Sequence, residues 1–203
     1  MPARALADER GLAIIPPYDD DRVIAGQGTC GLEIAEDLPD LTAVLVPVGG
    51  GGLAAGVATA VRALRPRARI VGVEPVLAAD ALDSFRSRRV VEWPAEAVGR
   101  TCADGTRTRA VGKRNLAHML ASLDDIVTVE EAEIEEGVRL AATETRLVVE
   151  PSGALSIAAL RFRAREAGLV GLEGSVVAVV SGGNVDPARY AAILGDIRAG
   201  APG

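Results

Sequence analysis

The sequence contains few aromatic residues and almost no lysine or histidine. Phenylalanine, tryptophan and tyrosine make up 2% of the 203 residues, while hydrophobic residues as a whole make up 49%. The core must therefore consist mainly of Ala, Val, Leu and Ile, which is typical of an α/β protein. Lys113 and His118 are the sole lysine and histidine. Few residues are thus available for chemistry that needs an amine or an imidazole.

Other absences limit the partners and the compartment. No apolar run approaches the ~20 residues of a membrane-spanning helix, and the first ten residues lack the apolar centre of a signal peptide. The net charge of −6 disfavours binding to nucleic acid. Cys30 and Cys102 have no spacing typical of a metal or redox motif. These features predict a cytoplasmic protein that binds neither nucleic acid nor a membrane.

Short Val- and Ile-rich runs alternate with longer segments of helical periodicity. Continuous apolar strands that alternate with helices favour a parallel sheet with both faces covered, so the pattern predicts an α/β fold with a mostly parallel twisted sheet. The predicted strands are residues 12–15, 43–48, 70–73, 126–129, 147–149 and 176–180. The predicted helices are residues 3–10, 53–64, 114–123, 130–145, 152–167 and 187–194, and residues 86–109 form the least regular part.

Four consecutive glycines, Gly49, Gly50, Gly51 and Gly52, separate a predicted strand from a predicted helix. Each glycine in an ordered segment costs roughly 0.5–1 kcal/mol relative to alanine, so the run indicates a tight turn that comes close to a ligand. The loop amides and the helix N-terminus favour a phosphate group. The segment also fits G-x-G-x-x-A, and Glu74 ends the next strand. A dinucleotide is therefore an alternative ligand, and a tight turn without a ligand is another.

A second glycine loop, S-G-G-N at residues 181–184, follows the last predicted strand. A hydroxyl at this end of a strand faces the crevice where α/β folds bind ligands, so Ser181 is a candidate binding residue; the alternative is a turn that caps the next helix.

Glu74 and Asp80 lie six residues apart across a proline-started turn and could hold Mg²⁺ or Ca²⁺ with a backbone carbonyl. Alternatively, Glu74 binds a ribose and Asp80 caps a helix. Glu150 and Ser152 are most simply a helix cap, and His118 a surface or packing residue.

Several motifs occur in a fixed order along the chain. They include P-P-Y-D-D at 16–20, V-I-A-G-Q-G-T at 23–29, V-P-V-G-G-G-G-L-A-A-G at 46–56, V-E-P at 73–75, A-D-G at 103–105, D-D-I-V-T-V at 124–129, E-P-S-G-A-L at 150–155 and S-G-G-N-V-D at 181–186. In this order the chain resembles the threonine dehydratase (threonine ammonia-lyase) and serine racemase group of fold-type II pyridoxal-phosphate enzymes. The resemblance displaces the dinucleotide interpretation.

The resemblance implies a function and a set of site residues. The fold would be the tryptophan synthase β-like large domain, and the reaction a pyridoxal-phosphate-dependent β-elimination that converts threonine or serine to a 2-oxo acid and ammonia. Such enzymes are expected to be homo-oligomers. The cofactor phosphate would lie against Gly49, Gly50, Gly51, Gly52 and Leu53, and the pyridine nitrogen against Ser181. Mg²⁺ or Ca²⁺ would be bound by Glu74, the carbonyl of Ala78 and Asp80, while Tyr18 and Gly105 would lie near the cofactor.

One departure from the family pattern affects catalysis. The S-x-K-x-R-G motif, whose lysine binds the cofactor covalently, does not occur here, and Lys113 lies in a charged turn that does not suit this role. The resemblance therefore predicts an N-terminally truncated chain, with residues 1–20 a remnant of the small domain and residues 21–203 an incomplete large domain. We expect an exposed sheet edge and an apolar face. The chain alone should be inactive; alternatives are a non-catalytic phosphate-ligand binding fragment, half of a split enzyme, or a serine racemase-type activity.

Overall fold

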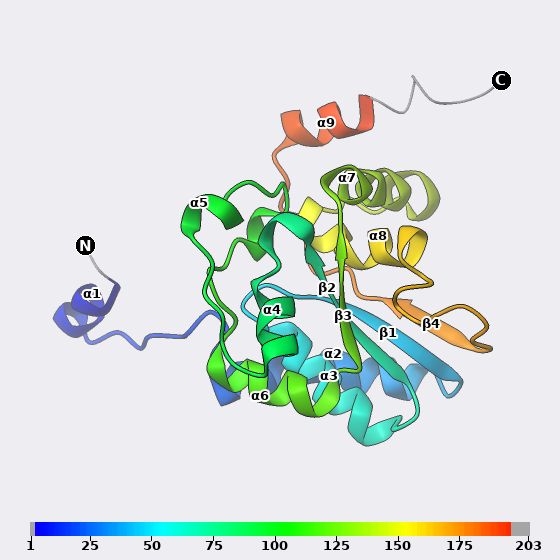
Figure 1. Cartoon of the computed structure of the whole chain (residues 1–203). Helices are drawn as coiled ribbons and strands as arrows, with labels where there is room; N and C mark the ends of the chain where they lie inside the picture. The colour runs from blue at the N-terminus through cyan, green and yellow to red at the C-terminus, as the bar shows by residue number, and fades with distance from the viewer. Residues whose placement is uncertain (1–2, 196–203) are drawn as a thin grey trace.

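A computed structural model describes residues 3–195, which form one parallel β-sheet with helices on both faces (Figure 1). The four strands are Leu41–Pro47 (β1), Arg69–Pro75 (β2), Asp125–Val129 (β3) and Ser175–Ala178 (β4). Their order is β3-β2-β1-β4, and every neighbouring pair is parallel. The predicted fold class is confirmed. Since β1 and β4 are neighbours, the loops that follow them emerge side by side.

The strands are buried on both faces because successive residues are apolar and point to opposite faces of the sheet. Val44, Val46 and Val48 of the β1 region pack on one face, while Ala43 and Leu45 pack on the other. The first face is covered by α2 (Asp21–Asp37), α3 (Gly52–Leu64) and α6 (Lys113–Ser122), and the second by α7 (Glu131–Leu140) and α8 (Leu155–Phe162) (Figure 1). Hydrophobic burial on two faces thus fixes the central strand.

Helix α2 is not among the helices predicted from the sequence, since its glycines are typical of loops. In the structure they permit close contact between α2 and α3. A Cβ at Gly31 would lie 2.6 Å from the carbonyl oxygen of Val57, and a Cβ at Gly56 would overlap that of Ile24. Asp20 caps the helix by accepting a hydrogen bond from the backbone N–H of Arg22 at 2.9 Å. The glycines therefore serve helix packing.

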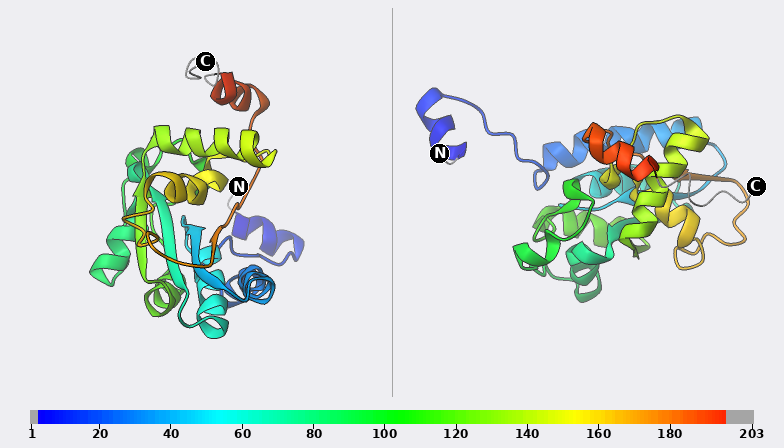
Figure 2. Two further views of the ribbon diagram at one scale, coloured as in Figure 1. Left: turned by 90° about the vertical axis from the view of Figure 1, so that its right-hand side faces the viewer. Right: turned by 90° about the horizontal axis from the view of Figure 1, so that it is seen from above.

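Two predicted strands are wrong. Residues 147–149 do not join the sheet: Leu147 and Val148 are 49% and 60% exposed, and Arg146, at φ 61°, turns the chain out of a π-helical turn at Ala141–Thr145. Residues 12–15 are also outside the sheet. They form a segment without helix or strand that follows α1 (Ala3–Arg10), and α1 stands away from the sheet in Figure 1 and in the right-hand view of Figure 2.

The other predicted elements are present with shifted ends. The helix predicted at 130–145 is α7 followed by the π-helical turn, and the one predicted at 152–167 is shorter, as α8 ends at Phe162. The remaining short elements are η1 (Val76–Ala78), α4 (Asp80–Ser87), α5 (Ala95–Val98), η2 (Asp104–Thr106), η4 (Pro151–Ala154) and α9 (Pro187–Gly195). The domain division at residue 20 stays a prediction, and residues 196–203 lie outside the described residues. Within residues 3–195, no helix combines the length and hydropathy needed to cross a bilayer.

One edge of the sheet is open, as expected. All four residues of β4 are partly exposed, whereas β1 and β2 are almost entirely buried. Beside β4 lies a mainly apolar groove of about 640 Å³. Its lining residues are Leu140, Ala141, Glu144, Thr145, Leu147, Ile157, Leu160, Arg161, Ala178 and Val180. An unpaired edge strand next to an apolar groove is a surface on which further polypeptide can dock.

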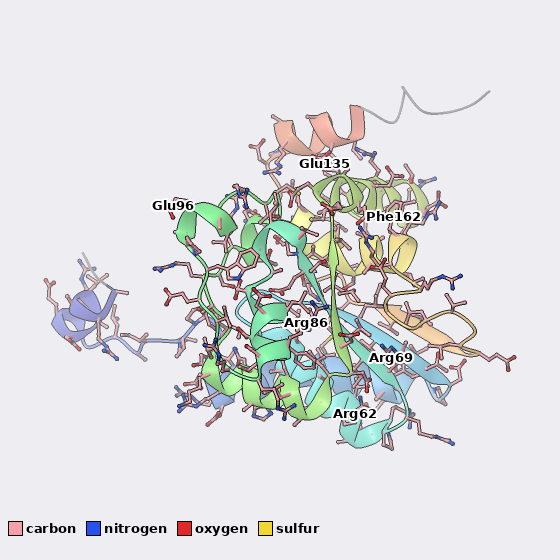
Figure 3. All side chains as sticks on the ribbon, viewed as in Figure 1. Arg62, Arg69, Arg86, Glu96, Glu135 and Phe162 are labelled. Atoms are coloured by element: carbon pink, nitrogen blue, oxygen red, sulfur yellow. The ribbon has the colours of Figure 1, made fainter. Side chains whose placement is uncertain are left out.

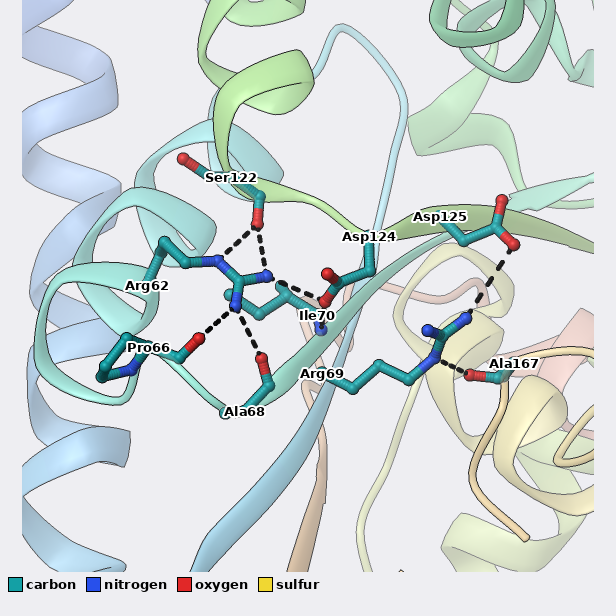
Figure 4. A network of polar contacts seen from close by, with 9 residues as sticks. All are labelled: Arg62, Pro66, Ala68, Arg69, Ile70, Ser122, Asp124, Asp125 and Ala167. Carbon is teal, nitrogen blue, oxygen red and sulfur yellow. Dashed lines mark hydrogen bonds and ion pairs between the residues drawn. The ribbon is translucent and has the colours of Figure 1, made fainter.

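An arginine network fixes the amino-terminal ends of the strands (Figure 4). Arg62 of α3 donates to the carbonyls of Ala68 and Ser122 and to the Asp124 carboxylate, whose Oδ2 also accepts the backbone N–H of Ile70 at 2.7 Å. Other charged side chains, such as Arg86 and Glu96, point outward into solvent (Figure 3). The network lies at the opposite end of the strands from the two glycine loops and therefore has a structural role.

Candidate functional site

The two predicted glycine loops meet in one cavity of about 360 Å³ at the carboxyl ends of β1 and β4. Of the candidate cofactor residues, Gly49, Gly50, Gly52, Leu53 and Ser181 line it. Its remaining lining residues are Pro17, Tyr18, Pro47, Gly105, Thr106, Thr108, Glu150 and Ser152. The cavity thus includes Tyr18 and Gly105, the two residues that the resemblance places near a cofactor. It lies where open α/β sheets bind ligands.

The first glycine loop presents the N-terminus of α3 to the cavity. Gly51 is the N-cap residue at φ 89°, a conformation that favours glycine, and no side chain caps the helix. The first backbone N–H groups of a helix have no partner within it, so those of α3 are free to bind a ligand. They carry the positive end of the helix dipole, which favours an anion. The loop therefore fits a phosphate group.

Tyr18 and Gly105 approach this loop from two other segments. The ring of Tyr18 lies directly against Gly50, where a Cβ would overlap it. Gly49 lies close to η2, since a Cβ there would lie 3.1 Å from the Cα of Thr106. The backbone N–H of Gly105, in η2, donates to Ser152 Oγ at 2.8 Å. These contacts bring the segments around residues 18, 105 and 152 to the glycine loop.

The loop that carries Ser181 is held by Glu150, the N-cap residue of η4. The backbone N–H of Asn184 donates to Glu150 Oε2 at 2.8 Å, and the N–H of Glu150 donates to the carbonyl of Gly182 at 3.1 Å. Ser181 itself is exposed. The sequence interpretation of Glu150 as a helix cap missed this contact with the last loop. The signal available in the sequence was the Glu150 carboxylate next to a glycine-containing turn.

Asn115 of α6 is a second residue that the sequence did not single out. It is fully buried, and its Nδ2 donates to the carbonyl of Gly50 at 2.6 Å. The backbone N–H of Gly112 donates to the same oxygen at 3.0 Å. Asp19 in turn accepts the N–H of Arg114 at 2.9 Å. The first glycine loop is therefore fastened to the start of α6.

Two buried carboxylates are those of Glu74, near the end of β2, and Asp80, which follows the strand. Both oxygens of Glu74 cap α4, accepting the N–H groups of Ala81 at 3.1 Å and Leu82 at 2.7 Å. Asp80 is the first residue of α4, not its cap, and neither of its buried oxygens has a hydrogen-bond partner within residues 3–195. Burial and the nearby Asp80 raise the pKa of Glu74 well above its ordinary value. Burial raises the pKa of Asp80 to about 7.

The predicted metal ligand Ala78 is buried in η1, between these two carboxylates in sequence. In the described part of the chain, no three side chains of His, Cys, Asp or Glu come together as a metal site. The predicted set contains only two such side chains, since its third ligand is a backbone carbonyl. The unpartnered Asp80 carboxylate is the feature that a cation would satisfy.

The single lysine and the single histidine lie outside the cavity. Lys113 is exposed at the first position of α6. His118 lies on the same helix, with its Nδ1 3.2 Å from Thr59 Oγ1 on α3. The packing interpretation of His118 agrees with this contact. A covalent bond between a cofactor in the cavity and Lys113 would require the exposed helix start to move.

Comparison with known proteins places this arrangement in a family. Residues 1–182 match the model of the pyridoxal-phosphate dependent enzymes. The chain is 41% identical over 191 residues to the L-threo-3-hydroxyaspartate ammonia-lyase of Saccharomyces cerevisiae, covering 94% of this chain and 56% of that protein. It is 38% identical over 193 residues to the serine racemase of Schizosaccharomyces pombe, covering 95% and 57%.

A solved structure gives the same result. The threonine deaminase of T.th. superposes with a TM-score of 0.82 and 46% sequence identity, covering 91% of this chain and 61% of that one. The chain therefore spans between half and two thirds of the length of these proteins.

Proposed function

The chain belongs to the family of pyridoxal-phosphate dependent enzymes, and we propose that it forms the cofactor-binding part of an ammonia-lyase for hydroxy amino acids. The substrate would be threonine, serine or a related small hydroxy amino acid, and the products a 2-oxo acid and ammonia. The observation that carries this proposal is the meeting of two glycine loops around one cavity of about 360 Å³. One loop suits a phosphate and the other offers a hydroxyl.

The residues of the cavity suit a phosphorylated pyridine. The N–H groups of Gly49, Gly50, Gly51, Gly52 and Leu53 would hold the phosphate, and the hydroxyl of Ser181 would contact the pyridine nitrogen. When bound, pyridoxal phosphate supplies an electron sink for the negative charge that develops at Cα of an amino acid. A neutral hydroxyl leaves the pyridine nitrogen less protonated than a carboxylate would, and this favours β-elimination over transamination. Tyr18, against Gly50, would exclude water from the phosphate.

The amine that binds the cofactor covalently must come from elsewhere, since Lys113 is exposed at the start of α6. We infer that this chain alone is inactive, and that a polypeptide with the S-x-K-x-R-G motif completes it. The open edge of β4 and the adjacent groove of about 640 Å³ support this proposal. A non-catalytic phosphate-ligand binding protein is the alternative if no such polypeptide restores activity.

Racemisation of serine is a second candidate activity. It is supported by the 38% identity to a protein named serine racemase. Elimination yields a 2-oxo acid and racemisation yields the D-amino acid, so the two products distinguish the activities.

We also propose that the completed protein is a cytoplasmic homo-oligomer. Gel filtration of the complemented protein tests the oligomeric state.

We propose Mg²⁺ or Ca²⁺ as a structural cation bound by Glu74, the Ala78 carbonyl and Asp80. The buried, unpartnered carboxylate of Asp80 supports this proposal. Titration with each cation should raise the melting temperature of the wild-type chain, since a ligand that binds only the folded state stabilises it. Asp80→Asn should abolish the rise, whereas Asp37→Asn at an exposed site should not. An equal rise in both variants would contradict the site.

The central experiment compares pyridoxal phosphate with pyridoxal. The chain should bind pyridoxal phosphate saturably and pyridoxal far more weakly, because the glycine loop recognises the phosphate. It should release no 2-oxo acid from L-threonine until a polypeptide with S-x-K-x-R-G is added. Equal binding of the two compounds would contradict the cofactor site. Turnover of threonine by the chain alone would contradict the inferred inactivity.

A further inference from the structure

Asn115 lies behind the first glycine loop, not in the wall of the cavity. Its side chain is fully buried near the start of α6. The carbonyl oxygen of Gly50 accepts two hydrogen bonds from this helix start, one from Asn115 Nδ2 at 2.6 Å and one from the backbone N–H of Gly112 at 3.0 Å. Both lone pairs of that oxygen are therefore occupied on the side of α6.

This pair of bonds fixes the direction of the next amide. A trans peptide places its C=O and N–H on opposite sides, and the described chain contains no cis bond. Because the Gly50 oxygen points to α6, the N–H of Gly51 points away from α6, and the residues on either side of it, Gly50 and Gly52, line the cavity. Gly51 is closely packed, since a Cβ there would lie 2.8 Å from Val111 Cγ2. The N–H is thus aimed before any ligand arrives.

The contact carries a cost for folding. The Oδ1 of Asn115 is buried and has no hydrogen-bond partner in the part of the chain that the structure describes. A buried oxygen without a partner opposes folding, and an apolar side chain of similar size would avoid the penalty. Stability alone therefore does not explain an amide at this position.

We propose that Asn115 is a positioning residue, which orients the Gly50–Gly51 peptide so that the N–H of Gly51 binds the cofactor phosphate. It acts through Gly50 and does not itself contact the ligand. The inference rests on the proposed function, because it takes the anion in the cavity to be the phosphate of pyridoxal phosphate. Preorganised donors of this kind strengthen binding because no reorganisation is needed when the ligand arrives.

The test uses Asn115→Leu in the full chain, with Ser156→Ala as the matched control. Ser156 is also fully buried with an unpartnered oxygen, but it lies on α8, away from the loop. Three quantities are measured: the affinity for pyridoxal phosphate and for pyridoxal, the hydrogen exchange rate of the Gly112 N–H, and the melting temperature.

Asn115→Leu should bind pyridoxal phosphate about five- to tenfold more weakly, with pyridoxal binding unchanged. The Gly112 N–H should exchange faster, since its acceptor is less fixed, while the melting temperature stays equal or rises. Ser156→Ala should change neither affinity nor exchange. Should Asn115→Leu fail to fold, Asn115→Ala tests the same loss of affinity.

Two results overturn the inference while the proposed function stands. One is an unchanged affinity for pyridoxal phosphate in a folded Asn115→Leu variant. The other is an equal loss of affinity for pyridoxal and pyridoxal phosphate together with a lower melting temperature, which indicates a purely structural role. If the wild-type chain does not prefer pyridoxal phosphate to pyridoxal, the proposed function fails first and the inference fails with it.

Discussion

Two glycine loops leave neighbouring parallel strands at the same end of the sheet, yet their surroundings differ. The loop after β1 lies between the Tyr18 ring and α6, and Gly51 has no space for a side chain. The loop after β4 follows a partly exposed edge strand, and Ser181 is open to solvent. The difference shows that the first loop, which would hold the phosphate in the proposed site, is fixed by this chain's own packing. The second loop, which would contact the ring, is less enclosed.

The largest expected effect comes from a methyl group in the first loop. Gly51→Ala should destabilise the fold by about 3 kcal/mol and abolish binding of pyridoxal phosphate, since alanine disfavours a φ of 89° and its Cβ would press on Val111. Urea unfolding and a binding titration measure the two effects. Gly182→Ala is the matched variant, because its φ is not in the left-handed region and the atoms nearest to its Cβ belong to the side chain of Glu150. Equal losses in both variants would remove the contrast between the loops.

The next effect concerns pH, because Glu74 and Asp80 are buried at the end of β2 and just after it, and β2 is the strand that pairs with β1. The folded state holds the Asp80 proton up to about pH 7, whereas the unfolded chain releases it near the ordinary pKa of 3.8. Stability should therefore fall as the pH rises from about 4, with Asp80 contributing up to about pH 7 and Glu74, whose pKa is also raised, contributing to the same fall. Asp80→Asn should reduce the fall and add about 2 kcal/mol at pH 8 without a divalent cation. A pH profile identical to that of wild type would refute the assigned titration.

A smaller effect is expected from the residue that holds the second loop. Glu150→Ala should cost about 1 kcal/mol or less, because the lost hydrogen bond to Asn184 is exposed. Proteolysis should then cut the segment 181–186 faster than in wild type. Glu150→Gln keeps an acceptor oxygen and should remain close to wild type. A cost near 3 kcal/mol for Glu150→Ala would show the second loop to be as fixed as the first.

The smallest effect is expected at Ser181 itself. Ser181→Ala should change the free energy of unfolding by less than about 0.5 kcal/mol, because the side chain is exposed. It should nevertheless shift the absorbance of bound pyridoxal phosphate, since the hydroxyl would contact the ring nitrogen. Thermal unfolding and a visible spectrum separate the two effects. An unchanged spectrum would argue against the proposed ring contact.

The sequence predicted the central part of the fold because its signals are local. The apolar runs at residues 43–48 and 70–73 lie within β1 and β2 apart from one residue, and the glycine run begins α3. The Leu147–Val149 region misled the prediction because an apolar run can equally cover a groove, and here it does. Helix α2 was missed because its glycines disfavour a helix locally. The reason for Gly31 is its close contact with Val57 on another helix, which the sequence does not show.

The supporting residues of the site could not be predicted for the same reason. Asn115 and Gly50 are 65 residues apart in sequence, and Glu150 and Asn184 are 34 apart. Nothing in the local pattern of α6 marks Asn115 as different from any other buried residue of an amphipathic helix. The motifs named the groups that would contact a ligand, while the residues that aim those groups became evident only from the tertiary contacts.

The position of β4 next to β1 has a consequence for synthesis on the ribosome. The hydroxyl of Thr42 bonds the carbonyl of Ser175 across 133 residues of sequence. At translation rates of about 5–20 residues per second, β1 waits roughly 7–27 seconds for this neighbour. A nascent chain can pair β1, β2 and β3 during that interval, but its central strand keeps one bare side. A chaperone that shields that side would be needed until β4 has been synthesised and the second glycine loop can join the first.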